Sequence, residues 1–232
     1  MSLPLVQLPT YTIELPVSKK KAKFRPFIVK EEKILLLANE EEKVDPIVDA
    51  IIQVMDLATF GAMDVATLPV ADLEYLFVKV RERSIGERIQ GEITCNACGN
   101  SQHYGIDLGK VEVINGVQSN SLKLDDSTII TMKYPTITAL RGLDKVTSAD
   151  MPLSVTATLV QSITIKDRVY DSTDFTKDEM VNWLEHCTES QINIIGTFLD
   201  NLPKVVYKDE VQCKNCTEKI NVYTEGIDSF FA

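Results

Sequence analysis

The chain has 232 residues, and its 34 acidic and 24 basic side chains give a formal net charge of −10. Its hydrophobic content of 44% is ordinary for a globular protein, which excludes a chain that is disordered throughout. The acidic excess argues against nucleic acid as the main partner, because affinity for phosphate backbones comes from clustered lysine and arginine. No apolar run reaches the roughly 18 residues that span a membrane, and the N-terminus lacks the features of a secretion signal, so we expect a protein of the cytoplasm.

Residues 1–86 predict an N-terminal β-hairpin followed by helices. Apolar and polar residues alternate over 11–16 and the chain returns over 21–27, which is typical of two antiparallel strands. Asp45 followed by Pro46 is typical of an N-cap with proline at the first helical position. Periodic apolar residues predict helices at 28–39, from Pro46 to the break at Gly61, and at 70–84.

Four of the five cysteines form two C-x-x-C pairs, Cys95 with Cys98 and Cys213 with Cys216. A strand-like run precedes and follows each pair, so each unit predicts a β-hairpin whose tip carries two thiols. Two such tips that face each other form a site of four sulfurs. Thiolates are soft ligands and four of them fill a tetrahedral shell, so this pattern predicts a structural Zn²⁺ ion and no open position for catalysis.

Other uses of the four cysteines are less consistent with the pattern. Two disulfides are unusual in a protein without a secretion signal. A redox C-x-x-C normally occurs once, at the start of a helix in a βαβ unit, whereas these two pairs lie between strands. An iron–sulfur cluster agrees with the number of ligands but is less usual in hairpins, and four unligated thiols are the remaining alternative.

Residues 99–212 separate the two pairs, which is far longer than the spacing within a compact zinc ribbon. A structureless loop of that length is improbable, so we expect a folded insertion whose entry and exit are joined by the metal. The fold class is therefore α+β: β-hairpins with a split zinc-ribbon-like pair of CxxC knuckles and helical groups, the second group inserted between the knuckles. We expect the following parts: an N-terminal hairpin with helices at 1–86, a split zinc-ribbon-like module at 87–108 and 204–226, an inserted α+β segment at 109–203, and a C-terminal tail at 227–232.

Within the insertion, Asn115 and Gly116 form a turn signal between two strand-like runs. Two capping-box patterns, Thr176 with Glu179 and Thr188 with Gln191, predict the starts of two further helices. The other expected elements are strands at 110–114, 121–124 and 128–133, helices at 136–145 and 149–162, and a strand or hairpin at 163–171.

The sequence contains no nucleotide-binding, nucleophile-elbow or zinc-protease motif, so we expect a protein that is not an enzyme. Cys187 lies at helical spacing from Trp183 and is interpreted as a buried, inert thiol. The basic cluster at 19–25 is either a solvated turn or a patch that binds a partner.

The segment 23–36, which reads KFRPFIVKEEKILL, resembles the N-terminal region of a baseplate hub protein family of T-even-like contractile-tailed bacteriophages. The resemblance is clearest over residues 8–40, including Pro9, Tyr11 and Leu15. It implies a non-enzymatic tail baseplate protein, either a hub component of the virion or a factor that assembles the hub in the host cytoplasm. It also implies that the partners are other baseplate hub or tape-measure proteins, within an assembly in which this chain could be oligomeric.

Aromatic residues beside a cation suit an interface anchor, so Phe24, Arg25 and Phe27 are candidate partner contacts, although both rings could equally be core of the first hairpin. Phe230 and Phe231 are further candidates. The competing function is a zinc-ribbon nucleic-acid-binding adaptor, because paired C-x-x-C knuckles are common in such proteins. The acidic residues around the knuckles argue against it.

Overall fold

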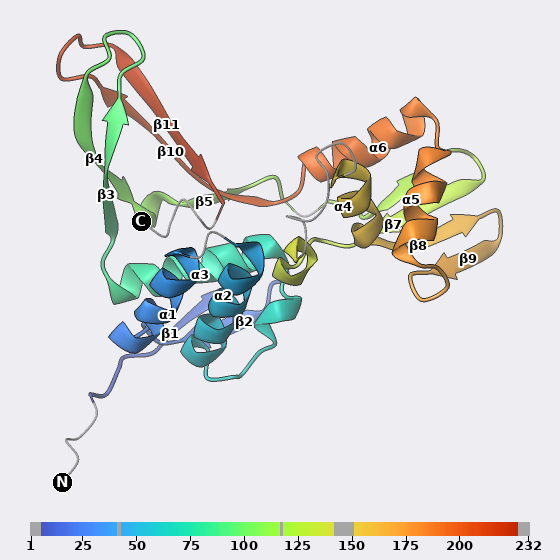
Figure 1. Cartoon of the computed structure of the whole chain (residues 1–232), viewed down its shortest axis with the longest axis horizontal. Coiled ribbons are helices and arrows are strands. Elements are labelled where there is room, and N and C mark those ends of the chain that lie inside the picture. The colour runs from blue at the N-terminus through green and yellow to red at the C-terminus, as the bar shows by residue number, and fades with distance from the viewer. Residues whose placement is uncertain (1–5, 41–42, 117, 142–150, 227–232) are drawn as a thin grey trace.

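The computed structural model describes residues 6–40, 43–116, 118–141 and 151–226. Figure 1 shows two lobes joined side by side and an arm of β-strands that projects from the first lobe. The elements are helices grouped with small antiparallel sheets, so the expected α+β class is confirmed. In the described residues no helix is long and apolar enough to cross a membrane.

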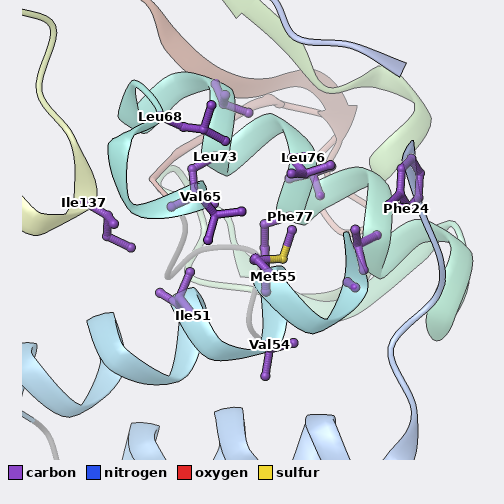
Figure 2. Close-up of a cluster of buried hydrophobic side chains, with 14 of the residues drawn as sticks. Phe24, Ile51, Val54, Met55, Val65, Leu68, Leu73, Leu76, Phe77 and Ile137 are labelled. Atoms are coloured by element: carbon purple, nitrogen blue, oxygen red, sulfur yellow. The ribbon is translucent and has the colours of Figure 1, made fainter. Parts of the chain in front are cut away.

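The first lobe packs a β-hairpin against three helices. Its elements are β1 (Tyr11–Glu14), β2 (Lys21–Phe24), α1 (Val29–Glu40), α2 (Val44–Ala58), a 3-10 helix (Val65–Thr67) and α3 (Val70–Ser84). Figure 2 shows the core that α2 and α3 share, in which Met55, Leu73 and Phe77 point toward one another. The hairpin turn is fixed on α3 because the buried Asp72 carboxylate accepts hydrogen bonds from the Val17 and Ser18 N–H groups, at 2.7 and 2.8 Å.

The expected N-cap of α2 is wrong by two positions. Lys43 occupies the N-cap without a side-chain hydrogen bond, and the helix begins at Val44. Asp45 and Pro46 therefore lie inside the first turn. Both residues suit that place, because the first N–H groups of a helix lack internal acceptors and a carboxylate there favours the helix dipole.

The arm consists of two antiparallel hairpins that come from distant parts of the chain. Its elements are β3 (Arg88–Thr94), β4 (Ser101–Asp107), β10 (Lys204–Gln212) and β11 (Lys219–Glu225). At the base of the arm a 3-10 helix (Leu108–Lys110) leads into β5 (Glu112–Ile114), which pairs with the start of β10. The core of the first lobe continues into this base through buried residues such as Leu108, Val205 and Tyr207.

The second lobe has a hydrophobic core of its own. Its sheet has the order β6-β7-β8-β9 and is covered by helices. The elements are β6 (Ser121–Lys123), β7 (Thr128–Met132), α4 (Met151–Leu159), β8 (Val160–Ile165), β9 (Arg168–Asp171), α5 (Lys177–Glu185) and α6 (Glu189–Asp200). Between β7 and α4 lies a 3-10 helix (Ile137–Leu140) whose Ile137 is buried in the core of the first lobe. Both expected capping boxes are confirmed, at Thr176 with Glu179 and at Thr188 with Gln191.

Three expectations for the insertion differ from the structure. The turn at Asn115 does not join two paired strands, because β5 pairs with β10 and β6 pairs with β7. The helix expected at 149–162 ends at Leu159, since Val160 already belongs to the buried strand β8. The described part of 136–145 contains a short 3-10 helix in place of an α-helix, and residues 142–150 lie outside the described residues.

Candidate metal centre

The two hairpin tips have the same backbone turn. In the first, the Cys95 N–H donates to the Asn100 carbonyl (2.9 Å) and the Gly99 N–H donates to the Cys95 carbonyl (2.8 Å). In the second, the Cys213 N–H donates to the Glu218 carbonyl (2.8 Å) and the Thr217 N–H donates to the Cys213 carbonyl (3.1 Å). Because both turns close in this way, each places its two cysteine side chains on the same side of the tip.

The residue after each second cysteine has a left-handed backbone, with φ of 71° at Gly99 and 62° at Thr217. Glycine adopts this conformation without cost, whereas a β-branched residue is strained there. We expect Thr217→Gly to stabilise the protein by about 0.5–1 kcal/mol and Gly99→Thr to destabilise it by about 1–2 kcal/mol. An added Cβ at Gly99 meets no atom within 4 Å, so the loss would come from the backbone alone.

Urea unfolding of the two variants beside the wild-type protein measures both effects. Shifts of the same sign in Thr217→Gly and Gly99→Thr would contradict the equivalence of the two turns.

Four sulfurs meet where the tips face each other. The Sγ atoms of Cys95 and Cys216 are 3.7 Å apart, those of Cys98 and Cys213 are also 3.7 Å apart, and all four lie within 4.8 Å of one another. Zn–S bonds of about 2.3 Å in a tetrahedron place neighbouring sulfurs about 3.8 Å apart. The donor set and its spacing therefore fit a tetrahedral metal ion held equally by both hairpins.

Hydrogen bonds prepare part of this site for metal binding. The Asn215 side chain, followed by the Asn100 backbone, lowers the pKa of Cys98 to about 6. Backbone N–H groups of Cys216 and Asn215 lower the pKa of Cys213. The Glu218 backbone lowers the pKa of Cys216, but the neighbouring sulfurs, above all that of Cys98, raise it to about 12. Since thiolates are the form that binds metal, these hydrogen bonds favour the metal-binding form of Cys98 and Cys213.

Gln102 links the two hairpins directly below the sulfurs, a role that the sequence pattern does not reveal. Its side-chain oxygen accepts from the Lys214 N–H (2.8 Å) and its amide nitrogen donates to the Gln212 carbonyl (3.3 Å). The side chain is buried although it is polar. Gln102 on β4 therefore positions the second knuckle independently of any metal.

A second polar link joins the hairpins near the base of the arm. One oxygen of Asp209 accepts from the hydroxyl groups of Tyr104 (2.7 Å) and Tyr207 (2.9 Å), and the Lys110 ammonium lies 3.3 Å away. The hydrogen bond from Tyr104, followed by that from Tyr207, lowers the pKa of Asp209 to about 2. The arm is thus tied at its base as well as at its tip.

This carboxylate makes the stability of the arm depend on pH. A carboxyl group whose pKa falls from about 3.9 in the unfolded chain contributes stability above that pH, and the contribution disappears as the pH falls from about 4 to 2. We expect Asp209→Asn to cost about 1 kcal/mol at pH 6 and nearly nothing at pH 2. Denaturant unfolding of both proteins in the presence of chelator measures this difference without a contribution from metal release. An equal difference at both pH values would contradict the role of the charge.

The other candidate residues lie away from the sulfurs. Phe24 and Phe27 belong to the core of the first lobe, with 1% and 8% of each residue exposed, so their burial supports the interpretation as core. Arg25 is held by two hydrogen bonds to Glu31. Cys187 is half-buried, its thiol donates to the Trp183 carbonyl (3.6 Å), and burial raises its pKa. Phe230 and Phe231 lie outside the described residues.

The fold and the site together define an α+β protein with two lobes and an arm, in which a four-thiol cluster joins two hairpins that are distant in sequence. A family model described as T4 bacteriophage base plate protein matches residues 8–232. The chain therefore belongs to this family of phage baseplate proteins, which confirms the baseplate part of the resemblance. No curated protein matches the chain. No solved structure matches it either.

Proposed function

We propose that the protein is a component of the baseplate hub or a factor that assembles the hub, and that it acts through contacts with other proteins and not as an enzyme. The observation that carries the proposal is the family match, which extends over residues 8–232. The resemblance of 23–36 to hub proteins supports the hub within the baseplate. Its partners are then hub or tape-measure proteins, met in the host cytoplasm during assembly and, for a hub component, retained in the tail.

We further propose that the cluster of Cys95, Cys98, Cys213 and Cys216 holds a structural Zn²⁺ ion. Four thiolates favour zinc among the common metals, and the ion would supply a rigid cross-link in place of chemistry. The tip needs such a cross-link, since the buried cluster that the described residues form there consists of Cys95, Cys213 and Ile220 alone. A rigid tip keeps the projecting arm in one shape, which suits a protein that docks in an assembly.

Mass spectrometry of purified virions against infected-cell lysate tests the hub proposal. A hub component is expected in both samples, in a fixed ratio to other baseplate proteins. An assembly factor is expected in the lysate alone, where it should co-sediment with hub intermediates. A protein that is in neither the virion nor any hub intermediate would contradict the proposal.

The nucleic-acid adaptor remains the second candidate, because the four-thiol arrangement is one that zinc ribbons use. The charges of the arm support it poorly: Lys219 pairs with Glu210 (2.7 Å) and Lys208 with Glu112 (3.6 Å). Phosphate binding needs unpaired cations on one face. Filter binding with duplex and single-stranded DNA at two salt concentrations tests it, and salt-dependent submicromolar affinity would reverse the ranking.

A further inference from the structure

The second lobe contains an open pocket where α5 lies beside β8 and β9 (Figure 1). Its volume is about 290 Å³. A cavity of about 150 Å³ holds a benzene ring, so this pocket has room for one large side chain. Three half-buried aromatic residues, Tyr170, Phe175 and Trp183, form part of its wall, and the buried residues Ile163 and Met180 also line it. The wall is therefore mainly aromatic and aliphatic.

The charged residues that line this pocket are both carboxylates, Asp174 and Glu179. One oxygen of Asp174 accepts from the Asp171 N–H (2.9 Å), and one oxygen of Glu179 accepts from the N–H (2.7 Å) and the hydroxyl (2.8 Å) of Thr176. The bonds from Thr176 lower the pKa of Glu179, so this carboxyl is charged at neutral pH. Among the described residues, no cation pairs with either carboxylate and the second oxygen of each takes no hydrogen bond.

The surroundings of the pocket are also negative. Residues 163–186, which include its whole described lining, contain six carboxylates against three lysine or arginine residues. One of these cations, Arg168, borders the pocket, and its guanidinium lies 4.7 Å from the centroid of the Tyr170 ring. An aromatic residue of the wall thus already stacks with a guanidinium. The described lining offers carboxylates and aromatic rings but no lysine or arginine, so it is complementary to a cation with an apolar stem.

We propose that this pocket binds an arginine side chain of another protein. The apolar stem of the arginine packs against Met180 and Trp183, and its guanidinium pairs with Asp174 and Glu179. Arginine suits this wall better than lysine, because its planar group stacks on aromatic rings and bonds a carboxylate through two nitrogens at once. Arginine is also enriched among the residues that dominate protein interfaces. The proposal rests on the proposed role in protein contacts only for the kind of partner, and it involves neither the hub nor the metal centre.

Titration of the full chain with a short peptide tests the proposal. Trp183 is the single tryptophan of the chain, so its fluorescence reports on the pocket directly. The probe is a tripeptide of glycine, arginine and glycine with blocked ends, and the controls replace its arginine with lysine or leucine. We expect a saturable change with the arginine peptide, and binding that is about threefold weaker with lysine and at least about tenfold weaker with leucine. No saturable change with the arginine peptide, or equally tight binding of the leucine peptide, would overturn the proposal.

Glu179→Gln separates the charge of the pocket from its fold. Glutamine also forms a capping box with Thr176, so the melting temperature should stay within about 2 °C, while the affinity for the arginine peptide should fall by about fivefold or more. Asp174→Asn should weaken binding in the same way. Asp178→Asn is the matched control, because Asp178 is the neighbouring exposed carboxylate of α5 but does not line this pocket. Its affinity should stay within about twofold of the wild-type value at physiological salt.

Unchanged affinity in both Glu179→Gln and Asp174→Asn would overturn the proposal. Sedimentation of the wild-type protein provides a further check: a dimer that Glu179→Gln dissociates would also overturn it, because the arginine would then belong to a second copy of the chain. These measurements use the purified chain, so their outcome does not depend on whether the virion contains the protein.

Discussion

Removal of the metal is expected to lower the free energy of unfolding by on the order of several kcal/mol, because the ion binds the folded tips and not the unfolded chain. Chelator and Cys213→Ser should have similar effects, since each removes the cross-link between β3–β4 and β10–β11. The second lobe has its own core and contains Trp183, the single tryptophan of the chain. Its fluorescence at 25 °C should therefore stay native while the melting temperature falls.

Cys187→Ser provides the matched control for this experiment. It also removes one thiol, but that thiol is half-buried on the second lobe, far in sequence from either knuckle. We expect its melting temperature to respond to chelator as the wild-type protein does, whereas Cys213→Ser should no longer respond. A chelator effect that persists in Cys213→Ser would place the metal elsewhere.

Glu31→Ala is expected to destabilise the first lobe by about 2–4 kcal/mol, because it leaves a largely buried guanidinium without its partner. Glu31 accepts from the two terminal nitrogens of Arg25, at 2.9 and 2.7 Å, and from the Ile28 N–H at 3.0 Å. These bonds hold the pKa of Glu31 below its usual value although burial alone would raise it. The same carboxylate thus neutralises Arg25 and caps the start of α1. Thermal and denaturant unfolding measure the loss.

Glu40→Ala and Arg25→Ala complete this test. Glu40 is the carboxylate at the other end of α1 and is exposed, so its removal should cost less than about 0.5 kcal/mol. Arg25→Ala should also lower the free energy of unfolding, as Glu31→Ala does, because the two residues form a structural pair. If Arg25→Ala kept full stability but lost co-purification with baseplate proteins, Arg25 would be an interface anchor and this account of it would be wrong.

The features that the sequence predicts well are encoded within short segments. The spacing of each C-x-x-C pair, the apolar period of 70–84 and the two capping boxes need no information from distant residues, and the corresponding elements form where expected. The pairing of β5 was mispredicted because a turn signal at Asn115 shows that the chain bends, not which strand it joins. Its partner β10 is selected by burial in the first lobe, which no local pattern records.

The residues that link the two hairpins could not be predicted from the sequence for the same reason. Gln102 acts on Lys214, and Tyr104 acts on Asp209, across more than 100 residues. Polar residues in hairpins are normally solvated, and only the fold shows that Gln102 is buried and that Tyr104 and Asp209 are partly buried. These two hydrogen-bonded links also change the interpretation of what the metal ion contributes to the arm. The base of the arm is already closed by the tyrosine–aspartate link and by β5, so the ion secures the tip of the arm and not its whole length.

The most direct test of the metal centre is native mass spectrometry of the purified full chain, combined with elemental analysis. We expect one zinc ion per chain, lost when Cys98 and Cys213 are both replaced by serine and kept in Cys187→Ser. Alkylation should modify none of Cys95, Cys98, Cys213 and Cys216 in the native protein, and all five cysteines after chelation and unfolding. A protein purified without chelator that contains no metal, with Cys95, Cys98, Cys213 and Cys216 all free to react, would contradict the account.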